Sequence, residues 1–174
     1  HLGRRLSAAA TPRDAAQIIG ETADALFGWD ACLMDLCTID QTKVETVYCV
    51  DTINGQRTEV SPVSPDRGQL AGRVLTHGAQ LILREPPAAF GGGLKPFGDL
   101  SRPSASILCV PLHKDSRVMG VFSIQSYTPH AYTQEHLHTL QSLADHCGGA
   151  LERIRAEQEI VRLNVELDRR VRER

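Results

Sequence analysis

The chain has 174 residues, of which 41% are hydrophobic, and its formal net charge is −2 at neutral pH. This length suits one domain with a stable core plus a short appendage, and the weak negative charge gives no reason to expect a nucleic acid as partner. No apolar run approaches the roughly 20 residues of a membrane-spanning helix, so we expect no membrane contact.

The first third of the sequence predicts one helix and one hairpin. Over 12–28, a Thr-Pro start and a regular apolar stripe that ends at Gly are typical of an amphipathic helix. The apolar run 31–39 and the segment 44–50 flank the turn "DQTK", which predicts an antiparallel hairpin. The Asn-Gly pair at 54–55 predicts a further turn.

The central part predicts a short helix over 67–78 and a short strand over 80–83. Residues 84–103 form a Pro- and Gly-rich loop that is longer than compact domains usually contain unless the loop has a function. We expect this loop to act as a lid in which Phe97 provides apolar cover, and a plain surface loop is the alternative. Two strands within 104–126, joined by the turn "HKDSR", follow the loop.

The last two predicted strands alternate in polarity. Phe122 and Ile124 share an apolar face, whereas Met119 and Ser123 share the opposite one. The other strands also have one apolar face and one face that mixes apolar residues with polar or sulfur groups. We expect the apolar faces to pack against the first and last helices.

The mixed strand faces predict a ligand site beneath the short helix and the long loop. The candidate ligand-binding residues are Asp35, Val74, Phe97, Cys109, Ser123 and Gln125. Asp35 stands out because a carboxylate in an apolar strand is costly unless it is paired or hydrogen-bonded. It either lies near a strand end or beside an Arg, or it binds a donor or cation of a ligand.

Other reactive residue types do not combine into a catalytic or metal site. His113, Asp115 and Ser116 fall in the turn, away from Ser123, so a catalytic triad is not expected. The five cysteines are scattered, with no Cys-x-x-Cys pair and no spacing typical of zinc. We therefore expect no catalytic residue, no metal ligand and a reducing, cytoplasmic compartment.

The C-terminal sequence predicts one long helix that begins after Thr133. Its apolar stripe runs from Leu140 to Val171, but the spacing slips between Ile154 and Ile160, which indicates a stutter in an imperfect heptad pattern. The remaining surface of the second half is mostly charged, so this part has too little apolar surface for a globular core. We expect a two-chain coiled coil, and a frayed tail is the alternative.

Two stretches, "GQLAGRVLTHGAQLIL" (68–83) and "SASILCVPLHKDSRVMGVFSIQSYTPHAYTQEHLHTLQSLADHCGGAL" (104–151), resemble the GAF domain family in residues and in order of elements. The resemblance implies an α+β fold, related to PAS domains, with helices on one face of an antiparallel sheet and a lidded pocket on the other. It also implies a GAF-like sensory domain over 1–154 and the start of a coiled-coil signalling linker over 155–174.

The tail "LNVELDRRVRER" (163–174) is similar to the linker helix before the output modules of bacterial sensor histidine kinases. This implies a regulatory domain of a two-component kinase that senses a small polar molecule. We expect it to form a parallel homodimer, which brings both tails together to the paired kinase cores, each tail to the core of its own chain. A ligand-free dimerisation module is the alternative. A more remote alternative is a Cys-dependent reductase that uses Cys109, as in free methionine sulfoxide reductases.

The departures from specialised GAF branches concern cofactors. The loop 84–103 contains neither the Cys nor the His with which phytochrome-type members attach a bilin, and it also lacks the Cys residues of the reductase branch. The Asn-Lys…Phe…Asp-Glu set of members that bind cyclic nucleotides is not found either. The sequence therefore identifies no cofactor, and neither a covalent bilin nor a cyclic nucleotide is expected.

Overall fold

The computed structural model describes residues 1–38, 40–61, 69–85 and 98–173. Within these ranges the elements are α1 (Leu2–Ala8), α2 (Pro12–Phe27), β1 (Ala31–Cys37), β2 (Val44–Ile53), β3 (Gln56–Glu59), α3 (Gln69–His77), β4 (Gln80–Leu83), β5 (Ser106–Lys114), β6 (Arg117–Ser126) and α4 (Gln134–Arg172). None of these helices is long and apolar enough to cross a membrane. Phe97 and most of the predicted lid lie outside the described residues.

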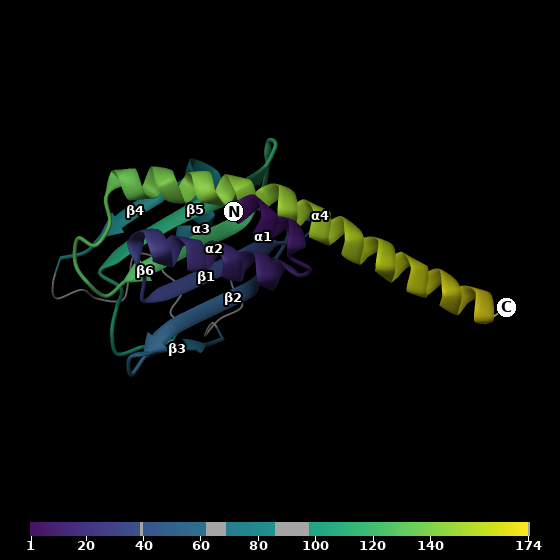
Figure 1. Cartoon of the computed structure of the whole chain (residues 1–174), viewed down its shortest axis with the longest axis horizontal. Helices are drawn as coiled ribbons and strands as arrows, with labels where there is room; N and C mark the ends of the chain where they lie inside the picture. The colour runs from purple at the N-terminus through teal and green to yellow at the C-terminus, as the bar shows by residue number, and fades with distance from the viewer. Residues whose placement is uncertain (39, 62–68, 86–97, 174) are drawn as a thin grey trace.

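The strands form one antiparallel sheet in the order β3-β2-β1-β6-β5-β4. Helices α1, α2 and α4 cover one face, which we call the helix face and which includes Met34 and Phe122 (Figure 1). Helix α3 packs on the other, which we call the site face and which includes Cys109 and Val121. The predicted α+β fold with helices on one face of an antiparallel sheet is confirmed.

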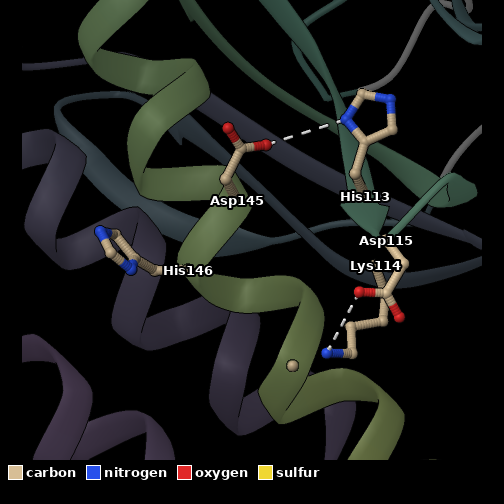
Figure 2. A pocket seen from close by; sticks show the side chains of 6 residues that line it. His113, Lys114, Asp115, Asp145 and His146 are labelled. Atoms are coloured by element: carbon tan, nitrogen blue, oxygen red, sulfur yellow. Dashed lines mark ion pairs between the residues drawn. The ribbon is translucent and has the colours of Figure 1, made fainter.

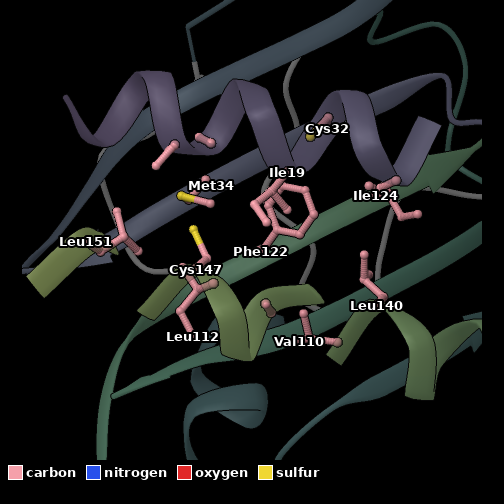
Figure 3. Packing of buried hydrophobic residues seen from close by; sticks show 14 of the residues in the cluster. Ile19, Cys32, Met34, Val110, Leu112, Phe122, Ile124, Leu140, Cys147 and Leu151 are labelled. Atoms are coloured by element: carbon pink, nitrogen blue, oxygen red, sulfur yellow. The ribbon is translucent and has the colours of Figure 1, made fainter. Parts of the chain in front are cut away.

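The main core lies between the sheet and the two long helices. Figure 3 shows Phe122 and Ile124 of β6 pointing toward Ile19 of α2 and Leu140 of α4, and all four side chains are fully buried. This confirms that the apolar strand faces pack against the helices. Alternation along the strands determined these positions because side chains two residues apart point to the same side of a sheet.

The prediction for Met119 was wrong. Leu112 pairs with Gly120 but His113 pairs with Val118, so Met119 is an extra residue on β6. This β-bulge interrupts the alternation, and Met119 joins the core on the helix face instead of lying beside Ser123. Strand β5 continues to Lys114, so His113 lies in β5 and not in the turn, where we expected it.

Both long helices begin with a capping box. Thr11 Oγ1 accepts a hydrogen bond from Asp14 N (3.1 Å), and Asp14 Oδ2 accepts one from Thr11 N (2.9 Å). In α4, Thr133 Oγ1 accepts from His136 N (3.3 Å) and His136 Nδ1 accepts from Thr133 N (3.4 Å). An imidazole thus takes the position that Glu usually occupies in this motif.

Helix α1 was not predicted, because its seven residues show no extended pattern. Its single buried side chain, Leu6, joins the main core. The guanidinium of Arg153 in α4 donates to the carbonyl oxygens of Leu6 (3.3 Å) and Ala9 (2.8 Å). The helix therefore depends on contacts with a residue more than 140 positions away in the sequence.

Strand β3 was also missed, although the turn before it was predicted. Asn54 and Gly55 both have positive φ (52° and 76°), the conformation of a tight hairpin turn. All four β3 residues are exposed, so the strand shows no alternating pattern. Arg57 anchors it through two hydrogen bonds to Asp24 (2.6 Å each) and by stacking on the Trp29 ring at 3.7 Å.

Helix α4 has 39 residues and, at 1.5 Å per residue, extends for about 58 Å. Ile154 is its last buried residue, and the second half projects away from the domain (Figure 1). Just past this point, Arg155 Nη2 donates to Cys37 O (2.5 Å). The exposed apolar side chains of the projecting half are Ile160, Val161, Leu163, Val165, Leu167 and Val171.

Candidate functional site

The centre of the site face is a row of three cross-strand neighbours. Ser123 of β6 pairs with Cys109 of β5 on one side and with Leu33 of β1 on the other. Both Ser123 and Cys109 are only 3% exposed. Ser123 Oγ has no hydrogen-bond partner within the part of the chain that the structure describes. A buried hydroxyl without a partner costs roughly 1–3 kcal/mol, so this atom requires an explanation.

The Cys109 thiol is chemically quiet in this environment. Its pKa is raised to about 12, mainly by burial; the Ser123 hydroxyl offsets a part of this shift, and the nearby Asp35 carboxylate adds a smaller increase. The thiol and that hydroxyl lie side by side, but they do not have the geometry of a hydrogen bond. At neutral pH the thiol is therefore almost entirely protonated, and thiolate chemistry is suppressed.

Asp35 lies on the same face, two residues along β1 from Leu33. It is 4% exposed, and its Oδ1 accepts a hydrogen bond from Thr46 Oγ1 on β2 (2.6 Å). Its backbone lies close to β6: a Cβ on Gly120 would overlap the Asp35 carbonyl oxygen, so glycine is required there. Asp35 lies inside β1, and among the described residues its hydrogen-bond partner is the cross-strand Thr46 and not an Arg.

Gln125 and Val74 complete the predicted set within the described residues. Gln125 lies two residues from Ser123 along β6, and its Oε1 accepts from Ser104 Oγ (2.6 Å). Val74 of α3 is buried in a small apolar cluster that includes Cys109 and Val121. The structure thus brings Val74, Cys109 and Ser123 together, and it places Asp35 and Gln125 on the same face with polar partners of their own.

A buried carboxylate that the sequence analysis missed lies on the site face of β2. Asp51 is fully buried and accepts hydrogen bonds from Tyr127 Oη (2.7 Å), Asp99 N (2.7 Å) and Thr52 N (2.8 Å). Gly98 has a φ of +68°, and a Cβ at this position would overlap the Asp51 carboxylate. The one available signal was a charged residue inside the apolar run "YCVDTI".

The Asp51 cluster fixes the chain where it leaves the predicted lid. Burial, followed by the hydrogen bond to Asp51, raises the pKa of Tyr127. The Arg102 guanidinium stacks on the Tyr127 ring at 4.0 Å and donates to Thr52 O (2.8 Å). Residues 98–102 are therefore attached to β2 through charge-assisted contacts.

A second group of polar residues lines a surface hollow between the β5–β6 turn and α4. Figure 2 shows His113 pointing toward Asp145, with 3.8 Å between Nδ1 and Oδ1, whereas His146 points away from this pair. Lys114 Nζ lies 3.8 Å from a carboxylate oxygen of Asp115. Within the described ranges no group of three His, Cys, Asp or Glu side chains has the arrangement of a metal site.

The family model for the GAF domain matches residues 9–152. The chain belongs to the GAF domain family. No curated protein is similar enough to this chain to count as a match.

Three solved structures have the same fold as this GAF domain. A bacteriophytochrome, RpBphP3 from R. palustris, matches 96% of the chain with a TM-score of 0.61 and 15% identity, and the chain spans 38% of its length. A free methionine-R-sulfoxide reductase from Neisseria meningitidis matches 90% of the chain over 89% of its own, at TM-score 0.61 and 19% identity. The domain of a putative two-component sensor histidine kinase from Sinorhizobium meliloti matches 87% of the chain over 97% of its own length, with a TM-score of 0.60 and 13% identity.

Proposed function

We propose that this GAF domain is the regulatory, small-molecule-sensing part of a two-component sensor histidine kinase. In this proposal residues 1–154 are the sensory domain, residues 155–174 begin the signalling linker, and the ligand binds on the site face. The observation that supports the site most directly is the buried Ser123 hydroxyl, for which the described part of the chain provides no hydrogen-bond partner. A ligand that hydrogen-bonds to this hydroxyl recovers the free energy that its burial costs.

The chemistry of the site face suggests a small polar molecule with an apolar side. Asp35 and Ser123 offer an acceptor and a hydroxyl, and Val74 and Cys109 offer apolar contact from α3 and β5. A hydrogen-bond donor or a cationic group on the ligand suits the Asp35 carboxylate. Specific pockets commonly combine such an apolar lining with a few polar groups.

The kinase context is supported by α4 and by one structural relative. The helix continues far beyond Ile154 with exposed apolar side chains, which a parallel partner helix would cover. The Sinorhizobium relative is described as a domain of a putative sensor histidine kinase. We propose that two copies pair in parallel through residues 155–172, which delivers both tails to paired kinase cores.

Two other functions remain as alternatives. In a ligand-free dimerisation module, the site face is a second core and the Ser123 hydroxyl is a tolerated defect. A reductase that uses Cys109 is less well supported, because the raised pKa of this thiol leaves almost no nucleophilic thiolate at neutral pH. The Neisseria relative shares the fold at 19% identity, which says nothing of the chemistry.

Native mass spectrometry of protein purified from its own host tests the sensing role. We expect a small molecule to stay bound to the natural sequence and to be lost from Ser123→Ala and Asp35→Asn. Ser116→Ala, on the exposed turn of the same hairpin, is the matched control and should retain the molecule. A natural sequence without any bound mass, together with a Ser123→Ala variant of equal or higher stability, would favour the dimerisation module.

Sedimentation tests the dimer. We expect the full chain to sediment as a dimer, and a chain that ends after Ile154 to sediment as a monomer, because the exposed apolar stripe is then missing. The double variant Val161→Glu and Val165→Glu should also be monomeric without any loss of chain. Equal oligomeric states for all three proteins would remove the tail from the interface.

A further inference from the structure

Helix α4 and strand β5 touch through their backbones at one position. Gly148 is buried, and a Cβ at this residue would overlap the carbonyl oxygen of His113. The next residue, Gly149, is exposed, and a Cβ there would meet no atom within 4 Å. Two adjacent glycines in the same helix therefore have opposite surroundings, and only Gly148 permits the close approach of the strand.

Further contacts between β5 and α4 flank this point on both sides. Gln141 Nε2 donates to Pro111 O (3.1 Å), which lies before the contact along both elements. Lys114 Nζ lies 3.9 Å from a carboxylate oxygen of Glu152, which lies beyond it. The end of β5 thus follows α4 over about three helical turns, and these turns lead directly to the projecting half of the helix.

The same strand passes through the centre of the site face. Cys109, the cross-strand neighbour of Ser123, precedes His113 by four residues on β5. The ladder between β5 and β6 shifts its register between Leu112 and His113, at the bulge formed by Met119. The extra residue lies on β6, so β5 itself runs without interruption from Cys109 to His113 and connects the site face to the contact with α4.

We propose that Gly148 is a coupling point at which displacements of β5 on the site face are transmitted to α4, and displacements of α4 to the site face. This inference rests on the proposed sensing function only for the origin of the displacement. The contact suits such a role because neither side has a flexible side chain that could absorb a shift, and packed interiors are not continuously deformable. A ligand that favours one position of β5 then favours one position of α4.

Coupling acts in both directions, so the inference is testable without a ligand: a change imposed on α4 must also shift the conformational equilibrium at the site face. Gly148→Ala adds a methyl group against the His113 carbonyl, and Gly149→Ala adds the same group where there is room. The measurement is the alkylation rate of each cysteine in the full chain with iodoacetamide, followed by peptide mass spectrometry. Cys109 reports on the site face, and Cys32, buried on the helix face, reports on general loosening.

We expect Gly148→Ala to accelerate alkylation of Cys109 by about 5- to 150-fold over Gly149→Ala, the range of ordinary allosteric coupling, with Cys32 unchanged. Equal Cys109 rates in the two variants overturn the inference. An equal acceleration at Cys32 also overturns it, because the effect is then a general destabilisation. The experiment uses no ligand, so these outcomes can be interpreted even if the domain proves not to bind a small molecule.

A second variant covers the case in which Gly148→Ala does not fold. Cys109→Met enlarges a side chain on the site face, and amide hydrogen exchange in α4 then reports from the other end of β5. We expect faster exchange over 145–150, around Gly148, and unchanged exchange over 137–140, which packs on the same sheet before the first of these contacts with β5. Unchanged exchange over 145–150 overturns the inference.

Discussion

The two faces of the sheet use the same strands but treat their polar groups differently. On the helix face, the fully buried Ser106 donates to Thr128 O (2.8 Å) and accepts from Ala131 N (3.0 Å). On the site face, the equally enclosed Ser123 has no partner among the described residues. The buried polar residues of the site face are Asp35, Asp51, Ser123 and Gln125.

The contrast between Ser106 and Ser123 indicates that the helix face stabilises the fold, whereas the site face is suited to binding. A face that only stabilises the fold gains from apolar contacts and from saturated hydrogen bonds, as on the helix face. On the site face Asp35, Asp51 and Gln125 also have hydrogen-bond partners, but the Ser123 hydroxyl has none among the described residues, and a buried polar group without a partner reduces stability. We therefore expect substitutions on the helix face to cost stability, and substitutions at Ser123 to affect binding instead.

The largest effect is expected for Phe122→Ala. The ring is fully buried between the sheet and the two long helices, so its removal leaves a cavity and should lower the free energy of unfolding by about 3–5 kcal/mol. Urea unfolding measures this change, and an unaltered m-value shows that the native state is otherwise intact. Val121→Ala on the site face is the companion variant, for which two lost methyl groups predict about 2 kcal/mol. A larger loss for Val121→Ala would invert the comparison of the two faces.

A smaller loss, about 2–3 kcal/mol, is expected for Asp51→Asn. The carboxylate accepts from Tyr127 Oη and Asp99 N, and hydrogen bonds to a charged acceptor are worth more than neutral ones. In Asn, the side-chain NH2 group replaces one carboxylate oxygen and then faces Tyr127 Oη or Asp99 N, which are themselves donors. The change should also expose the Gly98–Arg102 segment to proteolysis, which Asn at the exposed Asp115 should not do. Unchanged proteolysis would mean that other contacts fix this segment.

Sequence patterns predicted the sheet and its faces because these depend on local periodicity. Alternation placed Phe122 and Ser123 on opposite sides, and the Thr-Pro start located α2 to the residue. Met119 departed from the pattern because a bulge is set by the register between two strands, which a single strand does not reveal. The same limit applies to Gly148, whose partner lies on another element.

Long-range polar contacts account for the remaining differences. Asp51 finds its donors at Asp99 and Tyr127, 48 and 76 residues away, so the sequence shows a charged residue in a strand and no partner. Helix α1 depends in the same way on Arg153. The predicted pairing of Asp35 with a ligand donor stays a prediction, and Thr46 was not foreseen as its neighbour on β2.

The two buried serines give the most direct contrast between the faces. Ser106→Ala should cost about 1–3 kcal/mol, because Ala131 N loses its acceptor and the Thr128 carbonyl loses its donor. Ser123→Ala should be close to neutral or stabilising in the ligand-free protein, since it removes an unsatisfied hydroxyl. Thermal and urea unfolding of both variants measure the difference. A cost of more than 1 kcal/mol for Ser123→Ala would reveal a hydrogen bond at this position and remove the main support for the site.

The smallest effect concerns the edge of the sheet, where β3 is tied to α2. The Arg57 guanidinium, through its hydrogen bonds and charge, lowers the pKa of Asp24 below the ordinary value of 3.8. The pair therefore stabilises the protein fully above that value, and the contribution is lost as the pH falls through the lower folded-state pKa. Because both side chains are partly exposed, we expect only about 0.5–1 kcal/mol.

Asp24→Asn tests this pair and the independence of the two faces. We expect urea unfolding between pH 6 and pH 2 to show a shallower loss of stability for the variant, with the difference concentrated below pH 4, where the carboxylate of the natural protein becomes protonated. Asp168→Asn, on the exposed part of α4, is the control and should follow the natural protein. Since Asp24 lies on α2, on the helix side of the sheet, and contacts β3, alkylation of Cys109 should not change. A change in that rate would show that the edge of the sheet is linked to the site face, and that the two faces are not independent.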